Sequence, residues 1–503
     1  MPYKDIKLDP YGVVYDTNAL DVESQWNVVQ NMRFNDLACQ KFGGEVLGDA
    51  TTAQAYHLQF NGNHTTPLWY YMADGAVYKT QFDTDTLLLT GIPSAGTDWD
   101  STLFNNIPVF NNTVDPPWTT IDEVNLTPLP AFPANTICEA IRPYGSYLIA
   151  LNTTDTGTKQ ENRLIWSDAS DAGALPDSWD INDPTTLAGD AYLTSAKGEI
   201  IDGLTLRDMF VVYKTHSMYL MRQVPGQTVM KIDKVQVNTG LLAKNCVQEF
   251  KGMHFVVSDA DVVLFDGQTV KSIADKRVRT EIFGNIDVDN YANTYVTRYD
   301  RQDEMWICFP TFGESVPNRA AIWNWKDDTW TFRDLDQSYH ISSGLANFAV
   351  SPAWEDAIGN WEDYVGEWNP IANNPTTDTL VTASTLRLGI IDEGYDSYDV
   401  PMVSTLEKHS MDLDSDAVKL VDSIIPQITA EAGTVVYIRV GSQMLPDEHI
   451  TWHDEQEYTV GTSRETFHLV KGRYISVRFR TSGLGVNWKL HSFRIRIKQA
   501  GKE

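Results

Sequence analysis

Side chains that commonly take part in catalysis are scattered along this chain rather than grouped. Its ten histidines are spread over 503 residues, and none has a companion ligand at a spacing typical of a metal site. His216 and His254 fall in or beside apolar runs, where packing and turn roles are more common than catalysis. The phosphate-binding GxxxxGK[ST], the dinucleotide-binding GxGxxG, HExxH and GxSxG are all absent. We therefore expect no catalytic residues, no cofactor, no metal site and no enzymatic activity.

Adjacent carboxylates do not change this expectation. Asp303–Glu304 and Asp327–Asp328 are two such pairs, but the chain contains 68 acidic residues, so pairs arise by chance. Both pairs fall at predicted turns, where an Asp side chain binds its own backbone. Without a defined geometry they cannot be assigned as general acid and base.

One segment keeps a second function class open. SDASDAGALPDSW at 167–179 resembles the Asp-box of sialidase-type propellers, Ser-x-Asp-x-Gly-x-x-Trp. Asp171 and Gly173 have the right offset, but Ala169 stands at the Ser position and Trp179 comes late. A β-propeller carbohydrate-active enzyme or lectin is therefore kept as the alternative function.

The cysteines and the apolar runs indicate a compartment. Cys39, Cys138, Cys246 and Cys308 lie far apart, so we expect free thiols rather than a disulfide framework. The first residues do not have the pattern of a signal peptide, and no run approaches 18 apolar residues. We expect a protein made in a reducing cytoplasm, with no membrane-spanning segment.

The strongest local pattern is a repeated β-hairpin. Residues 68–80, 208–222 and 252–267 each contain two apolar runs that flank a turn of Asp, Gly, Ser or Thr. Short apolar runs with turn signals continue along the chain, and none holds a helical period of 3.6. Units of 40–50 residues match four short strands, so the pattern predicts an all-β protein with a β-propeller body. A two-sheet sandwich is the alternative for this region.

Four regions follow from these patterns. We expect an extended N-terminal lead-in over 1–45, a propeller over 46–350, an irregular acidic insertion with three tryptophans over 351–402, and a C-terminal β-sandwich over 403–503. Arginines alternate with apolar residues near the C-terminus, which is typical of a sheet with one solvated face.

Charge is distributed unevenly. Residues 471–503 have nine basic and one acidic side chain, a net +8, so the rest of the chain carries −37 of the total of −29. Generic nucleic-acid binding requires the opposite sign. The acidic body serves solubility or the repulsion of a polyanion. The basic end either docks on an acidic partner, including a second copy, or simply faces solvent.

Several segments of the chain follow one another in a recognisable order. They are WNVVQNMRFNDLACQKFGG, WDSTLFNNIPVFNNTVDPPW, RLIWSDASD…PDSWD, GEIIDGLTLRDMFVVYKTHSMYLM, HFVVSDADVVLFDGQTVKSIADKRVR and NWKL. The first has the Trp-x-x-x-x-Asn-x-x-Phe pattern at Trp26, Asn31 and Phe34. In this order the segments resemble the tail nozzle (tail tubular or hub) proteins of short-tailed bacteriophages. The similarity covers about 24–335, with a weaker match at 465–498.

This resemblance implies a structural virion component with a propeller body and further β domains. Six copies would form a ring below the portal and adaptor, extend the DNA channel, and help to retain and then eject the genome. The implied partners are the other copies, the portal–adaptor ring, possible tail fibres or spikes, and double-stranded DNA that passes without sequence-specific binding. The protein would be made in the host cytoplasm and reside in the virion tail.

Overall fold

The chain is built almost entirely of β-strands. The computed structural model describes residues 3–501, apart from 23, 63–67, 83, 94–95, 97, 226–228, 346–377, 414–416 and 446–447. Within this part the one α-helix is α1 (Arg279–Phe283), and three short 3-10 helices are Ala19–Asp21, Tyr291–Asn293 and Asp300–Gln302. The predicted all-β class is confirmed.

Seven four-stranded antiparallel sheets form the body. The innermost strand of each sheet contacts the innermost strands of the two neighbouring sheets, and the last contacts the first, so the sheets close into a ring. This is a seven-bladed β-propeller. Its blades in chain order, with the innermost strand first, are β6 (His57–Asn61), β7 (Leu68–Ala73), β8 (Ala76–Thr80) and β9 (Thr86–Thr90); β10 (Asp100–Phe104), β11 (Ile107–Asn111), β12 (Trp118–Thr119) and β13 (Thr127–Pro128); β14 (Thr136–Tyr144), β15 (Tyr147–Asp155), β16 (Thr158–Trp166) and β17 (Gly189–Tyr192); β18 (Ile200–Leu206), β19 (Met209–Lys214), β20 (Met218–Gln223) and β21 (Met230–Lys234); β22 (Val247–Phe250), β23 (Met253–Val257), β24 (Val262–Phe265) and β25 (Val270–Ser272); β26 (Tyr295–Tyr299), β27 (Glu304–Phe309), β28 (Arg319–Asn324) and β29 (Thr329–Asp334); β30 (His340–Gly344), β31 (Thr379–Ser384), β32 (Arg387–Ile391) and β5 (Glu45–Ala50).

The predicted hairpins are the central strand pairs of these blades. In the first blade, β7 is buried along its whole length and turns into β8 through Asp74 and Gly75. Gly75 has φ +67°, and a Cβ there would lie 2.9 Å from the carbonyl oxygen of Ile92, so this tight turn favours glycine. The hairpins at 208–222 and 252–267 form β19–β20 and β23–β24 in the same way.

The last blade corrects two predicted boundaries. It combines β30, β31 and β32 with β5, so a strand from the start of the propeller closes the ring. The propeller therefore extends to Ile391 rather than to 350, because 379–391 supply two strands that we expected inside the acidic insertion. The rest of that expectation, over 351–377, lies outside the described residues.

The second domain is a sandwich of two six-stranded sheets, as predicted for 403–503, but it includes the N-terminus. The expected lead-in over 1–45 is wrong, because its strands pair with C-terminal strands: β1 with β40, β4 with β40, and β2 with β33. One sheet contains β1 (Lys4–Leu8), β3 (Met32–Asn35), β4 (Ala38–Lys41), β40 (Trp488–Gly501), β34 (Val418–Ala430) and β38 (Thr466–Gly472); the other contains β2 (Val28–Gln30), β33 (Ser404–Met411), β39 (Tyr474–Thr481), β35 (Val435–Gln443), β36 (Thr451–Trp452) and β37 (Gln456–Thr459).

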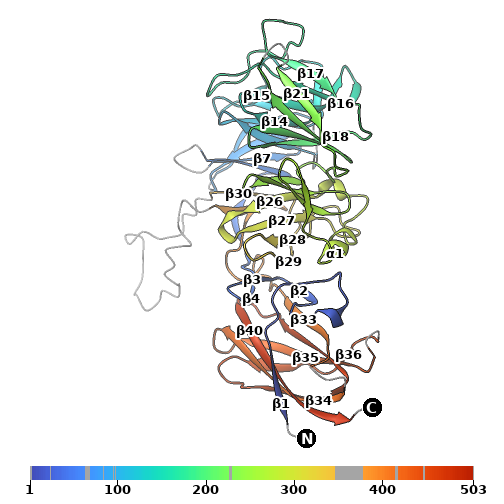
Figure 1. The fold of residues 1–503 in the computed structure, drawn as a ribbon. Coiled ribbons are helices and arrows are strands. Elements are labelled where there is room, and N and C mark those ends of the chain that lie inside the picture. The colour runs from blue at the N-terminus through green and yellow to red at the C-terminus, as the bar shows by residue number, and fades with distance from the viewer. Residues whose placement is uncertain are drawn as a thin grey trace.

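The two domains are joined into one elongated body. Figure 1 shows the sandwich at one end, with both chain termini at its far tip. Its strands β2 and β3 contact β29, the outermost strand of the sixth blade, so the sandwich abuts the rim of the propeller. One continuous apolar core runs from Trp26 and Phe493 in the sandwich to Phe255 and Trp330 in the blades.

Candidate functional site at the propeller axis

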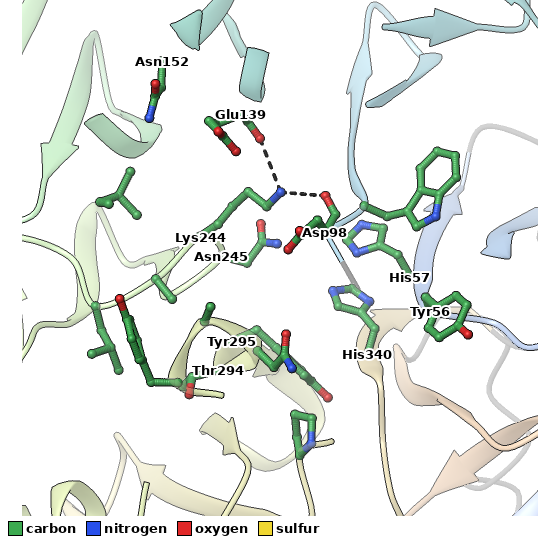
Figure 2. A pocket seen from close by; sticks show the side chains of 18 of the residues that line it. Tyr56, His57, Asp98, Glu139, Asn152, Lys244, Asn245, Thr294, Tyr295 and His340 are labelled. Atoms are coloured by element: carbon green, nitrogen blue, oxygen red, sulfur yellow. Dashed lines mark hydrogen bonds between the residues drawn. The ribbon is translucent and has the colours of Figure 1, made fainter. Parts of the chain in front are cut away.

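A polar pocket opens at one end of the propeller axis. It has a volume of about 230 Å³, and all seven blades contribute to its lining. In six blades the lining residues lie near the start of the inner strand, whereas blade 3 contributes Glu139 from the middle of β14, Asn152 of β15 and Lys159 of β16. Figure 2 shows side chains converging on it from opposite sides of the ring. Radial packing of the blades explains this, because inner strands that run side by side bring their N-terminal ends to one place.

A cluster of buried charges adjoins the pocket through Asn245, which is one of the lining residues. Arg142 on β14 pairs through Nη1 with Asp100 of β10 (2.6 Å) and through Nη2 with Asp202 of β18 (2.9 Å). Nη2 also donates to Asn245 Oδ1 (2.9 Å), whose backbone N–H donates to Asp202. We call these four residues the axis cluster. Burial alone would lower the pKa of the Arg142 guanidinium, but Asp100 and Asp202 outweigh it and raise the pKa, so the group stays charged.

Two imidazoles lie close together, tilted by 33°, where the ring closes. His57 begins β6 of the first blade and His340 begins β30 of the last, and their ring centroids are 4.0 Å apart. His57 Nε2 contacts Ser101 Oγ at 2.9 Å, and His340 Nδ1 accepts from the backbone N–H of Leu58 at 3.3 Å. Burial lowers the pKa of His340 to about 4 and that of His57 well below its ordinary value, helped by the neighbouring ring, so both are neutral at pH 7.

Two lysines complete the charge pattern of the wall. Lys159 bridges Glu139 (3.4 Å) and Glu199 (3.0 Å). Lys244 Nζ instead donates to two backbone carbonyl oxygens, those of Asp98 (2.8 Å) and Glu139 (3.3 Å), as the dashed lines in Figure 2 show. The wall thus offers donors and acceptors together, with positive and negative charges close to balance.

The histidines considered from the sequence lie elsewhere. His254 is buried in β23, where Nδ1 contacts the Tyr213 hydroxyl (2.7 Å) and Nε2 contacts the Thr205 carbonyl (3.0 Å), so it is a packing residue as expected. His216 lies in the exposed turn between β19 and β20, 3.4 Å from Asp259. Neither lines the pocket.

The adjacent carboxylates have separate structural roles. Asp303 and Asp328 occupy turns with φ of 56° and 52°, as predicted. Glu304 does not: it is buried in β27 and pairs with both Nε and Nη2 of Arg33 at 3.1 Å. The turn prediction failed there because Glu304 begins the strand and meets a charged partner from the other domain.

The Asp-box-like segment forms a packed loop between β16 and β17. The Asp171 carbonyl accepts from the Ala174 N–H (3.1 Å), and Trp179 packs edge-on against Phe132 with ring centroids 4.9 Å apart. The segment does not line the pocket. It therefore adds nothing to the site at the axis.

Three further expectations concern thiols, metals and membranes. All four cysteines are free and buried, as predicted. Among the described residues no cluster of three or more His, Cys, Asp or Glu side chains is arranged to hold a metal ion. A search of the same residues finds no helix with the length and apolar character needed to cross a membrane.

Comparison with known proteins does not identify the function of this site. No protein-family model matches the chain, and no curated protein is significantly similar. Among solved structures, the computationally designed protein Ika8 has 10% identity and a TM-score of 0.36, over 77% of this chain and 98% of that one. A protein of unknown function from Desulfotomaculum acetoxidans DSM 771 has 10% identity and a TM-score of 0.31, over 57% of this chain and 83% of that one. Likenesses this distant carry no argument about function.

Proposed function

We propose that this protein is a structural component of a short-tailed phage virion: a tail nozzle whose six copies form a ring below the portal and adaptor. The proposal is motivated by the sequence segments that resemble this family and follow one another in the same order. The observation that supports it most directly is a pair of exposed surfaces, one on each domain. Both surfaces contain exposed apolar side chains, and their charges are opposite.

The first surface is on the sandwich. On the edge strand β38, Phe467 and Leu469 are 65% and 80% exposed, and they alternate with buried residues so that both point outward with Lys471. Leu420 of β34 pairs with Lys471 of β38 on one side and with Lys498 of β40 on the other, so the two lysines lie on the same face of the sheet. Arg494 is four residues before Lys498 on β40, so it lies on this face too. We call this set the sandwich outer face. It collects part of the basic C-terminal charge beside exposed apolar side chains.

The second surface is the β12–β13 loop of blade 2, over 120–126. Ile121 and Val124 are 66% and 62% exposed, beside Asp122. Hydrogen bonds from the backbone N–H groups of Asn125 and Val124 to Asp122 lower the pKa of this carboxyl to about 2. The loop therefore presents two exposed apolar side chains beside a fixed negative charge.

We infer that the blade-2 loop of one copy packs against the sandwich outer face of the next. Such a contact joins two different surfaces, so repetition produces a ring when the rotation closes. Opposite charges would align the copies, and the apolar residues would be desolvated. Because the apolar core is continuous across the two domains, each copy would behave as one rigid subunit.

The DNA path in this proposal lies between copies rather than through a propeller. Within each propeller the axis cluster joins the inner strands of three successive blades, so the proposal does not route duplex DNA along the propeller axis. Residues 42–402 contain 22 basic and 49 acidic side chains, against 17 and 19 in the rest of the chain. A channel wall formed by propellers would repel phosphate and keep DNA from adhering.

Negative-stain microscopy and mass measurement of the purified protein, alone and with its portal–adaptor complex, test the proposal. We expect sixfold rings. Leu469→Asp with Lys471→Glu, or Ile121→Lys with Asp122→Lys, should each abolish them, and the two sets mixed in one sample should restore hetero-rings. Val288→Lys, at an exposed apolar side chain elsewhere, is the matched control. Strictly monomeric protein even with the adaptor would refute the nozzle, whereas rings that survive both variant sets would refute only the interface.

A further inference from the structure

The axial pocket has the dimensions of a site for one small molecule. Its walls come from seven blades, and Asn245 of the axis cluster is one of the lining residues. A volume of about 230 Å³ lies just below the roughly 300–1,000 Å³ typical of sites for drug-sized ligands. Such a pocket admits a single ring with its substituents, not a polymer strand. The nozzle proposal makes no use of it, so the inference below is independent of that proposal.

The hydrogen bonds of the two imidazoles fix what they present to the pocket. The Ser101 hydroxyl donates to Gln59 Oε1 (2.8 Å), so at Ser101 Oγ it is His57 Nε2 that donates. His57 Nδ1 is then an acceptor. His340 Nδ1 accepts from Leu58, so Nε2 carries the proton and is a donor. Within the described part of the chain neither of these second nitrogens has a hydrogen-bond partner. The two imidazoles thus leave one acceptor, His57 Nδ1, and one donor, His340 Nε2, for a ligand.

The charged groups favour a neutral ligand. Lys244 uses two of its three protons on backbone carbonyls and keeps one, while the Asp98 carboxylate is exposed beside it. An anion would face the carboxylates of Asp98 and Glu139. A cation would face Lys244 and, below it, Arg142. A hydroxyl group satisfies both kinds of partner, because it donates one hydrogen bond and accepts others.

Aromatic side chains supply an apolar surface at the rim. Tyr56 and Tyr339 meet edge to face with centroids 5.2 Å apart, and Tyr291 is 45% exposed. Aromatic walls with a few placed polar groups are the usual make-up of a small-molecule site. A saturated ring with hydroxyls at its edge and C–H groups on its faces matches both features.

We propose that the axial pocket binds one neutral polyhydroxylated ring of the size of a single sugar unit. Its hydroxyls bridge the open nitrogens of His57 and His340 and contact Lys244 and Asp98, and its C–H face lies toward the rim tyrosines. One molecule binds per chain, with a dissociation constant on the order of 1 mM, as befits a small, solvent-exposed polar ligand.

Ligand-observed NMR and calorimetry on the full chain test this with D-glucose, D-galactose, D-mannose, myo-inositol and, as a charged probe, inorganic phosphate. We expect at least one of the neutral compounds to bind saturably and phosphate not to bind. Lys244→Met and His340→Asn should each weaken binding at least tenfold, whereas Lys231→Met and His216→Asn, at exposed positions outside the pocket, should leave it unchanged.

Two results would overturn the assignment. One is the absence of saturable binding by every neutral probe at dissociation constants below about 10 mM, which would leave the pocket to water. The other is phosphate binding that competes with or exceeds the sugars. If His340→Asn lowers the melting temperature, Lys244→Met decides the question, because the hydrogen bonds that Lys244 Nζ makes within the described part of the chain go to backbone carbonyl oxygens.

Discussion

Two buried arginines, each paired with two carboxylates, stabilise different parts of this molecule. Arg142 sits within the propeller and joins strands of three successive blades. Arg33, from the β3–β4 hairpin of the sandwich, reaches into the propeller, where Nη1 pairs with Asp392 at 2.6 Å and the rest of the guanidinium pairs with Glu304. The first pairing closes a ring, and the second fixes one domain on the other.

The two arrangements differ in how much they depend on one residue. At the axis, the described residues place only Arg142 in ion pairs with Asp100 and Asp202. At the junction, burial would raise the pKa of Asp392, but Arg33 and then Arg333 outweigh it and lower the pKa. A second guanidinium therefore stabilises this carboxylate. Removing one partner of a buried ion pair is costly because the other charge stays buried without a counter-charge. Loss of Arg142 at the axis should therefore destabilise the protein more than loss of Arg33 at the junction.

Arg142→Met should produce the largest loss of stability. It leaves Asp100 and Asp202 buried without a counter-charge, at a cost of about 3–5 kcal/mol. Urea unfolding followed by tryptophan fluorescence measures the change. Adding Asp100→Asn and Asp202→Asn to Arg142→Met should recover part of the loss, because the stranded charges are removed. A single-variant loss below about 1 kcal/mol would show that water or nearby groups compensate the axis.

Arg33→Met should cost less, about 2–3 kcal/mol, because Arg333 still stabilises Asp392 while Glu304 is left unpaired. The loss should appear first at the junction, so limited proteolysis should release the sandwich from the propeller before either unfolds. Arg33→Met with Glu304→Gln is the matched rescue. A loss equal to that of Arg142→Met would contradict the role assigned to Arg333.

The same contrast explains what the sequence allowed us to predict. The hairpins at 68–80, 208–222 and 252–267 follow from local alternation and turn residues, so they could be predicted. The partners of β5 and of the N-terminal strands could not, because their pairing joins residues hundreds of positions apart and leaves no local signal. The expectation of a separate N-terminal lead-in failed for this reason.

The axial pocket was missed for a related reason. His57 and His340 belong to opposite ends of the propeller sequence and meet only because the ring closes. One weak signal was present: HLQFN and HISSG are both short runs that begin with His after a turn. A search for catalytic or binding residues by their spacing in sequence cannot detect such a pair. The two histidines occupy equivalent positions in two blades but are far apart in the sequence.

Acid should weaken the closure between the first and last blades. The pKa of His340 is about 4 when folded against an ordinary 6.5, and that of His57 is also depressed. Below pH 6.5 the unfolded chain therefore binds more protons than the folded chain. The contribution of these histidines to the free energy of unfolding is fully present above pH 6.5 and is lost as the pH falls toward 4. Each such histidine contributes a slope of at most about 1.4 kcal/mol per pH unit.

His340→Asn tests this assignment, because Asn keeps an acceptor for the Leu58 N–H but does not titrate. Denaturant midpoints measured across this pH range should show a shallower slope for the variant than for the wild type. His254 and His468, whose pKa values burial also lowers to about 4, keep part of the slope in both. An unchanged slope in His340→Asn, with His216→Asn as the exposed control, would mean that His340 is not a source of the acid sensitivity.

The smallest effect should come from an ion pair that lies at the surface. Arg277 Nη2 contacts Asp328 at 2.8 Å, but the two side chains are 38% and 55% exposed. Water screens this pair and solvates either partner alone, so Arg277→Gln should cost no more than about 1 kcal/mol. Raising the salt concentration should shrink that difference further, whereas the loss caused by Arg142→Met should persist, because Arg142, Asp100 and Asp202 are buried and buried pairs are screened much less. If salt reduced both losses alike, the axis cluster would have to be hydrated, and its distinction from the surface pair would disappear.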